Sequence, residues 1–177
     1  MSLATPRDLF VHELADAMSA EQQILKAMPD LQKDAQHPEF KSALKEHEAE
    51  TRQHVKNLQA VFKSLGEKPE ETTCLGMQGL MEEHRSLHEE DPAPEVLELA
   101  TLNGAEKTEH YEIVAYTGLV QMAKDLGEKE AAQLLQENLD QEKAMAKRVA
   151  DLTKAISKDI KAAMKEAEKA EKEEAAA

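Results

Sequence analysis

The strongest constraint on this chain is a glutamate near the middle of an otherwise apolar stripe, repeated in three of its four predicted long helices. Apolar residues recur along these segments at spacings of three and four, which places them on one helical face. The acids that interrupt the stripes are Glu21, Glu109 and Glu142. Burying several unpaired carboxylates together costs on the order of several kcal/mol each. We therefore expect these side chains to be protonated, paired or bound to a common cation, unless each stripe is displaced by one position and the acids only flank it.

The second long helix carries histidines on its stripe, in the pattern His47-x-x-Glu50-x-x-x-His54. Spacings of three and four let a carboxylate and an imidazole reach one ion from the same helical face. His54 lies on the stripe, and we expect it to be a nitrogen ligand. His47 either supports a metal ligand without binding the ion itself or lies near the end of the bundle.

Acidic residues that face inward from four helices, with histidine among them, are how di-iron and di-manganese sites are built. Hard oxygen ligands with few imidazoles favour Mn and Fe(II) over Cu or Zn. The sequence therefore predicts a carboxylate-rich site for two Fe or Mn ions. Its expected ligands are Glu21, Glu50, His54, Glu109 and Glu142.

Glu109 has three chemically similar neighbours on the third long helix. Glu106 shares its face, and His110 and Glu112 flank it on opposite sides. The spacing does not separate these residues, so each stays open as a further ligand, as does His47.

Helix-breaking and capping residues set the limits of the first two long helices. The first opens at Thr5-Pro6, where threonine can cap a helix and proline suits its first position. Pro29 predicts that this helix kinks or ends near Met28. The second runs from about Pro38 to Leu65, and Gly66 suits the left-handed conformation that closes many helices.

The segment 66–94 separates the second and third long helices and contains one short predicted helix, from Cys74 to His88. A connection of nearly thirty residues can cross the length of a bundle, which is the long crossover of ferritin-like topology. The third long helix begins at Pro94 or Glu95 and ends at Leu126-Gly127. The fourth follows within a few residues and continues past Ile156. The predicted fold is thus an all-α, ferritin-like four-helix bundle.

Composition narrows the class further. The 177 residues suit one domain, which we place at residues 1–157, followed by a charged helical tail rich in Ala, Glu and Lys at residues 158–177. A net charge of −14 argues against a nucleic-acid partner, whose phosphates require basic patches. The N-terminus lacks the basic and apolar regions of a secretory signal, and no run approaches the ~18 apolar residues that span a membrane. We expect a cytoplasmic protein with no membrane partner.

Several motifs resemble one known family in the order in which they occur. The similarity is to the YciE/YciF family of ferritin-like proteins and covers almost the whole chain outside the tail. It implies a rubrerythrin-like four-helix bundle, commonly a homodimer, associated with bacterial stress responses and proposed to hold two metal ions. The motifs that carry it are Leu9-Phe10-Val11-His12-Glu13-Leu14, Ala20-Glu21-Gln22-Gln23, His47-Glu48-Ala49-Glu50-Thr51, Glu109-His110-Tyr111-Glu112-Ile113 and the segment from Leu134 to Lys143.

The chain departs from the usual di-iron pattern because it contains no Glu-x-x-His. The fourth long helix offers Met145 or Ala146 where a second histidine is expected, so the second ion lacks a nitrogen ligand unless His110 or His47 supplies it. The sequence is compatible with three functions of different classes. They are a di-metal oxidoreductase that scavenges peroxide or oxygen, a non-catalytic metal-binding protein, and a structural dimeric bundle whose buried acids pair with His and Lys.

Overall fold

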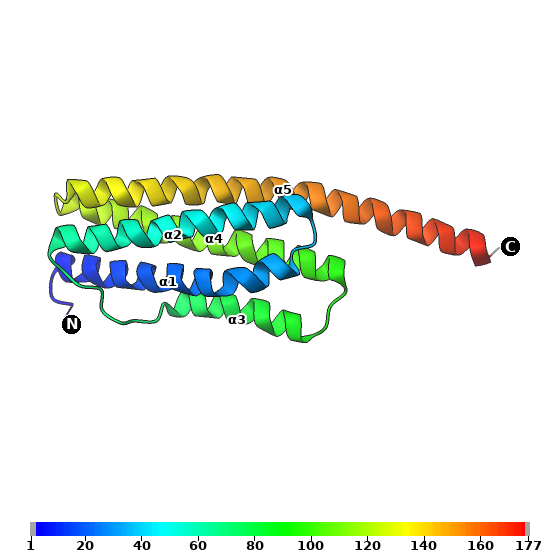
Figure 1. The fold of residues 1–177 in the computed structure, drawn as a ribbon, viewed down its shortest axis with the longest axis horizontal. Helices are drawn as coiled ribbons and strands as arrows, with labels where there is room; N and C mark the ends of the chain where they lie inside the picture. Colours follow the sequence, from blue (N-terminus) through cyan, green and yellow to red (C-terminus); the bar gives the residue numbers. More distant parts are fainter. Residues whose placement is uncertain (1–2, 176–177) are drawn as a thin grey trace.

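The computed structural model describes residues 3–175, and this part of the chain folds into five α-helices without a β-strand (Figure 1). The bounds of the long helices and of the crossover helix agree with the sequence predictions to within a few residues, apart from the end of the first. The helices are α1 (Pro6–Asp34), α2 (Pro38–Leu65), α3 (Leu75–Glu89), α4 (Pro94–Asp125) and α5 (Lys129–Ala175).

Four of these helices form a bundle of ferritin-like topology, as predicted. In Figure 1, α1 and α5 run in one direction, and α2 and α4 run in the other. Each bundle helix packs against two others, in the cycle α1–α2–α5–α4. The crossover between α2 and α4 carries α3, which packs on the outside of α1 and α4. Because this connection returns along the bundle, α2 and α4 are parallel, whereas a short loop would have made them antiparallel.

Local chemistry sets most of the helix ends. Thr5 forms a capping box with Asp8 at the start of α1, and Gly66 closes α2 with φ 70°. The buried carboxylate of Glu98 accepts hydrogen bonds from the backbone N–H groups of Gln36 (2.5 Å) and His37 (2.9 Å), at the start of α2. Pro29 does not end α1, which continues to Asp34. A proline inside a helix removes one backbone donor, and here packing of the surrounding turns retains the helix.

The apolar core of the bundle consists of two clusters. One includes Phe10, Leu14 and Phe62 and lies toward the start of α1. The other includes Met28 and Phe40 and lies toward the α1–α2 turn, where α3 adds further side chains. Along each of the four bundle helices, buried polar residues lie between the residues of the two clusters, so a polar layer divides the core.

The last helix extends beyond the bundle (Figure 1). Ile156 is the last fully buried residue of α5 among those described, and Ile160 is partly buried against the same cluster. The side chains of residues 161–166 are exposed. The predicted tail is helical as far as Ala175, and its residues 176–177 lie outside the described part of the chain. The division of the chain at residue 157 stays a prediction. Within residues 3–175, no helix has the length and apolarity that crossing a membrane requires.

A close contact between α3 and α4 gives a test of the crossover packing. A Cβ on Gly76 would lie 2.5–2.8 Å from atoms of the Tyr111 ring, whereas a Cβ on Gly79 would meet nothing within 4 Å. We expect Gly76→Ala to lower the free energy of unfolding by about 1–3 kcal/mol, because the ring or the helix must move. Gly79→Ala, on the same helix, should raise it by about 0.5–1 kcal/mol, because alanine restricts the unfolded chain. Urea unfolding of both variants checks the opposite signs, and equal effects would contradict this packing.

Candidate metal centre

The polar layer between the two apolar clusters consists of four carboxylates and two imidazoles. Each of the four bundle helices contributes at least one of them, and every one is at most 2 % exposed. They fall into two groups in which one ligand atom per residue lies within 4.8 Å of the others, and Glu142 belongs to both. The layer is composed of Glu21 from α1, His47 and His54 from α2, Glu109 and Glu112 from α4, and Glu142 from α5.

The first group joins α1, α2 and α5 around the imidazole of His54. Its Nδ1 lies 3.2 Å from Glu21 Oε1 and 2.9 Å from Glu142 Oε1. Its Nε2 lies 2.7 Å from Gln141 Oε1. Two carboxylates thus converge on one ring nitrogen, while the other nitrogen is engaged by a neutral amide.

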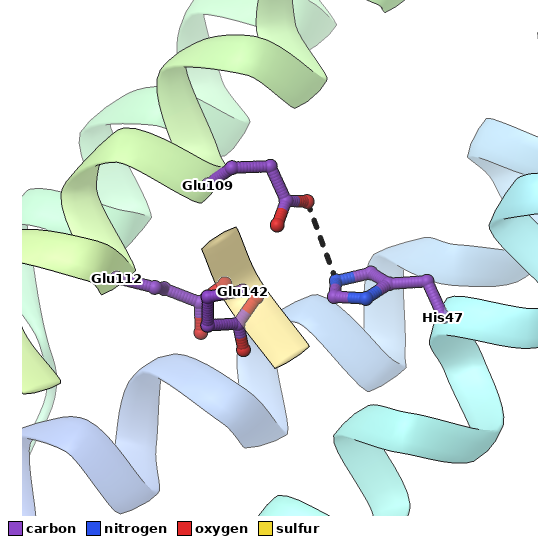
Figure 2. A group of neighbouring side chains, drawn as sticks. All are labelled: His47, Glu109, Glu112 and Glu142. Carbon is purple, nitrogen blue, oxygen red and sulfur yellow. Dashed lines mark ion pairs between the residues drawn. The ribbon is translucent and has the colours of Figure 1, made fainter. Parts of the chain in front are cut away.

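The second group joins α2, α4 and α5 around His47 (Figure 2). Its Nε2 lies 3.4 Å from Glu109 Oε1, and its Nδ1 lies 3.5 Å from Glu50 Oε2. Figure 2 shows the polar ends of Glu109, Glu112 and Glu142 turned toward one another, with the ring of His47 at their edge. Three carboxylates therefore share a small volume with one imidazole.

A chain of hydrogen bonds behind the first group fixes the orientation of its members. The hydroxyl of Tyr116 donates to Glu21 Oε1. Asn138 donates from Nδ2 to that hydroxyl at 3.1 Å, and Asn57 donates to Asn138 Oδ1 at 2.7 Å. Burial and the charge of Glu21 raise the pKa of Tyr116 well above its usual value, so the phenol remains a donor. Such outer partners hold metal ligands in one orientation in other proteins.

Many polar atoms of the layer make no hydrogen bond, although His54 forms ion pairs with Glu21 and Glu142. Buried side-chain atoms without a partner are concentrated here, and among the described residues the only such atom elsewhere is His37 Nδ1. Neither oxygen of Glu112 or Glu142, and neither ring nitrogen of His47, makes a hydrogen bond. Buried polar atoms are normally satisfied, and carboxylate and imidazole are the donors that Fe and Mn accept. The donor set therefore fits a divalent cation.

The electrostatics of the layer follow from burial. Burial raises the pKa of Glu109 and Glu112 well above the usual glutamate range, and repulsion from Glu142 adds to it. Burial also raises the pKa of Glu21, although the nearby imidazole partly offsets this. For His54, burial favours the neutral ring, but Glu142 and Glu21 outweigh it and raise the pKa to about 10. The pKa of Glu142 is lowered despite its burial, because His54 stabilises the charged form. Without a cation, the ion pairs of His54 with Glu21 and Glu142 hold the layer together, and burial favours the protonated forms of Glu109 and Glu112.

The structure brings together most of the residues that the sequence singled out. Glu21, His54, Glu109 and Glu142 are in the layer, as are His47 and Glu112, which spacing had left open. Glu50 is in neither group, because its side chain is 40 % exposed and contacts only the outer nitrogen of His47. Glu106 is half-buried and His110 is exposed, and neither joins a group. Glu21 contacts the imidazole of His54.

Sequence reasoning missed the outer polar residues. Asn138 and Gln141 lie four residues and one residue before Glu142 on α5, respectively, and Asn57 is three residues after His54. An asparagine at a stripe position, such as Asn138 between Leu135 and Leu139, is a signal that could have identified one of them. Spacing alone does not say which buried acid an amide supports.

The comparisons with known proteins agree with this architecture. The family described as "Domain of unknown function (DUF892)" matches residues 5–174. The chain belongs to this family. It is 35 % identical over 153 residues to Protein YciF of Escherichia coli K12, which covers 86 % of this chain and 92 % of YciF.

Solved structures support the family assignment and the fold. The crystal structure of the E. coli stress protein YciF aligns with a TM-score of 0.84 at 33 % identity, covering 88 % of this chain and 99 % of YciF. YcfI of Rhodopseudomonas palustris aligns with a TM-score of 0.82 at 35 % identity, covering 84 % of this chain and 95 % of YcfI. A two-domain protein from Anabaena variabilis with a ferritin-like domain aligns with a TM-score of 0.62 at 19 % identity, covering 88 % of this chain and 38 % of that protein. This last similarity concerns the fold alone.

The partnerless carboxylate of Glu112 gives a test of the layer in the metal-free protein. Its pKa is raised, so its contribution to stability is complete below the unfolded value near 4.5 and is lost as pH rises through the folded value. We expect Glu112→Gln to stabilise the metal-free protein at pH 8 by on the order of 1 kcal/mol, and by less at pH 5. Chemical unfolding at the two pH values measures the difference. Glu106→Gln, on the same helix and outside both groups, is the control and should change stability little at either pH.

Proposed function

We propose that the polar layer binds two Fe or Mn ions and that the loaded protein consumes peroxide or oxygen. The observation that carries the proposal is the set of partnerless, fully buried carboxylate and imidazole atoms from four helices. An arrangement that served only packing would satisfy these atoms within the protein, because a buried polar atom without a partner costs about 1–3 kcal/mol.

The two groups divide the ligands between two ions. Glu21, His54 and Glu142 hold one ion, and Glu142 is shared with the other. The second ion takes His47, Glu109 and Glu112 in addition. Each ion then has one nitrogen ligand, although the chain contains no Glu-x-x-His. The further expectation that Glu50 is a metal ligand stays a prediction, and its contact with His47 Nδ1 gives it a second role in orienting that ring.

The protein residues around the ions exclude water and hold protons. Bound Fe or Mn would supply the two electrons that reduce peroxide to water. Tyr116 keeps its proton beside Glu21, and Asn138 fixes the position of its hydroxyl. The two apolar clusters close the layer on both sides along the bundle axis, which excludes water from those two directions.

We also propose a role in bacterial stress. The support is the relationship to YciF, which is described as a stress protein. We propose further that the protein is a homodimer located in the cytoplasm and that it has no nucleic-acid partner.

A non-catalytic metal-binding protein is the second candidate. The observation that favours it is that both imidazoles lie on α2 while α5 places Met145, which is 4 % exposed, in the apolar cluster beside the layer. The resulting site has few nitrogen ligands for a protein that cycles between oxidation states. The third candidate, a structural bundle, requires that the acids be satisfied without any cation.

Metal uptake tests the site itself. We expect the purified, chelator-treated protein to bind two Mn²⁺ per chain by calorimetry and elemental analysis. At a free Mn²⁺ concentration of ~100 times the dissociation constant, one site raises the free energy of unfolding by about 2.7 kcal/mol, seen as a higher Tm. Glu142→Gln should lose most of this stabilisation because Glu142 belongs to both groups. Glu137→Gln, an exposed acid one turn earlier on α5, should retain it. A Tm that responds to neither Mn²⁺ nor chelator would favour the structural bundle.

Peroxide consumption separates the catalytic from the non-catalytic candidate. We expect the Fe- or Mn-loaded protein to remove hydrogen peroxide over many turnovers by disproportionation, in which a second peroxide is oxidised to oxygen and returns the two electrons to the ions. Glu142→Ala and His54→Ala should reduce the rate by at least tenfold. An oxygen electrode and a colorimetric peroxide assay measure the reaction. Full metal loading without turnover would support storage or a structural role for the ions instead.

A further inference from the structure

A cavity of about 370 Å³ lies between α1 and α4 and reaches the polar layer. Its inner wall includes Glu112 and Tyr116, which are both at the metal centre. Its outer part is lined by Glu13 and Asp16 on α1. The cavity therefore connects half-buried acids near the surface with a fully buried ligand.

The three carboxylates of this cavity differ in their surroundings. Glu13 and Asp16 are half-buried, so water and ions can reach them. Glu112 is 2 % exposed, and neither of its oxygens has a hydrogen-bond partner. A buried carboxylate without a partner at the inner end of a cavity is a strong attractor for a cation, because the low-dielectric surroundings strengthen the interaction.

Tyr111 holds the outer acid in place. Its hydroxyl donates to Asp16 Oδ2 at 3.5 Å and lies 3.0 Å from Cys74 Sγ, at the start of α3. The contact of Tyr111 with Gly76 fixes the ring against the crossover helix. The acid at the mouth of the cavity is thus positioned by α3, which lies outside the bundle.

A second cavity touches the layer at His47 and Glu109, but its chemistry differs. Its volume is about 30 Å³, and its wall is mostly apolar, with Ile24, Met28 and Leu80 among the lining residues. This space is close to the volume of a single water molecule. A hydrated divalent cation does not fit it, whereas the 370 Å³ cavity has room for an ion with several waters.

We propose that the cavity between α1 and α4 is the access site for divalent cations, with Glu13 and Asp16 as transient ligands that deliver the ion to Glu112. This inference rests on the proposed metal-binding function. The two outer acids act on the rate of loading and not on the final occupancy, because neither belongs to the groups that hold the ions.

The experiment measures how fast the metal-free protein takes up Co²⁺, by stopped-flow visible absorption, and separately how much it binds at equilibrium, by calorimetry. The test variant is Glu13→Gln/Asp16→Asn. The control is Asp30→Asn/Glu137→Gln, which removes the same charge from exposed positions away from this cavity. We expect the test variant to load about tenfold more slowly than the wild type, with a weaker dependence on salt, because local steering is lost. The control should load at nearly the wild-type rate, and all three should reach the same stoichiometry.

A steric variant provides an independent arm. Ala115 is half-buried in the wall of the cavity, and Ala115→Phe should slow loading without changing the amount bound. If the test variant loads as fast as the control, the access site is wrong while the metal centre stands. If the wild type takes up no Co²⁺, Mn²⁺ or Fe²⁺ at all, both this inference and the proposed function fail.

Discussion

The structure depends on the burial of four carboxylates at one level of a four-helix bundle. Burying a carboxylate at each of these positions costs more free energy than burying a leucine there, which would make the surrounding apolar clusters continuous. His54 is held as a cation against two of the acids. With four carboxylates and two imidazoles, the layer carries more acid than its own bases can neutralise. The raised pKa values of Glu109 and Glu112 express this imbalance, since burial and repulsion from Glu142 disfavour their charged forms. A cation bound in the layer would supply the missing positive charge.

The crossover supports this arrangement in two ways. By returning the chain along the bundle, it makes α2 and α4 parallel, so that His47 and Glu109 meet across the core although they belong to distant parts of the sequence. By carrying α3 over α1 and α4, it covers the side of the bundle that holds Ala20 and Leu102, and places Cys74 against Tyr111. The crossover therefore sets the direction of α4 and also covers one side of the bundle.

The fold could be predicted closely from the sequence because helix stripes, prolines and glycines act locally. The acids at the centres of stripes, Glu21, Glu109 and Glu142, could be predicted for the same reason, since a charged residue in an apolar register faces the core wherever the helix packs. Glu50 illustrates the limit of such reasoning. At about 100° per residue it lies about 60° from His47 around the helix, away from Thr51, and this angle takes it off the buried face. Glu112 lies as far from Glu109 in the same sense, yet it is buried because α1 covers that flank of α4. Spacing gives the angle, but only the packing of neighbouring helices decides whether a flank is covered.

The placement of both imidazoles on one helix distinguishes this centre from a site built on two Glu-x-x-His motifs. Seven residues separate His47 from His54, a rise of about 10.5 Å along the axis, yet their ring centroids are 6.5 Å apart because the side chains lean toward each other. A shift or tilt of α2 therefore moves the nitrogen ligands of both groups together, whereas in a two-motif site the nitrogens move with separate helices. Glu142 adds a second link, because it lies in both groups on α5. Two ions held in the proposed way would share a helix and a carboxylate, so the occupancy of one site would change the charge and the position of the ligands that remain for the other.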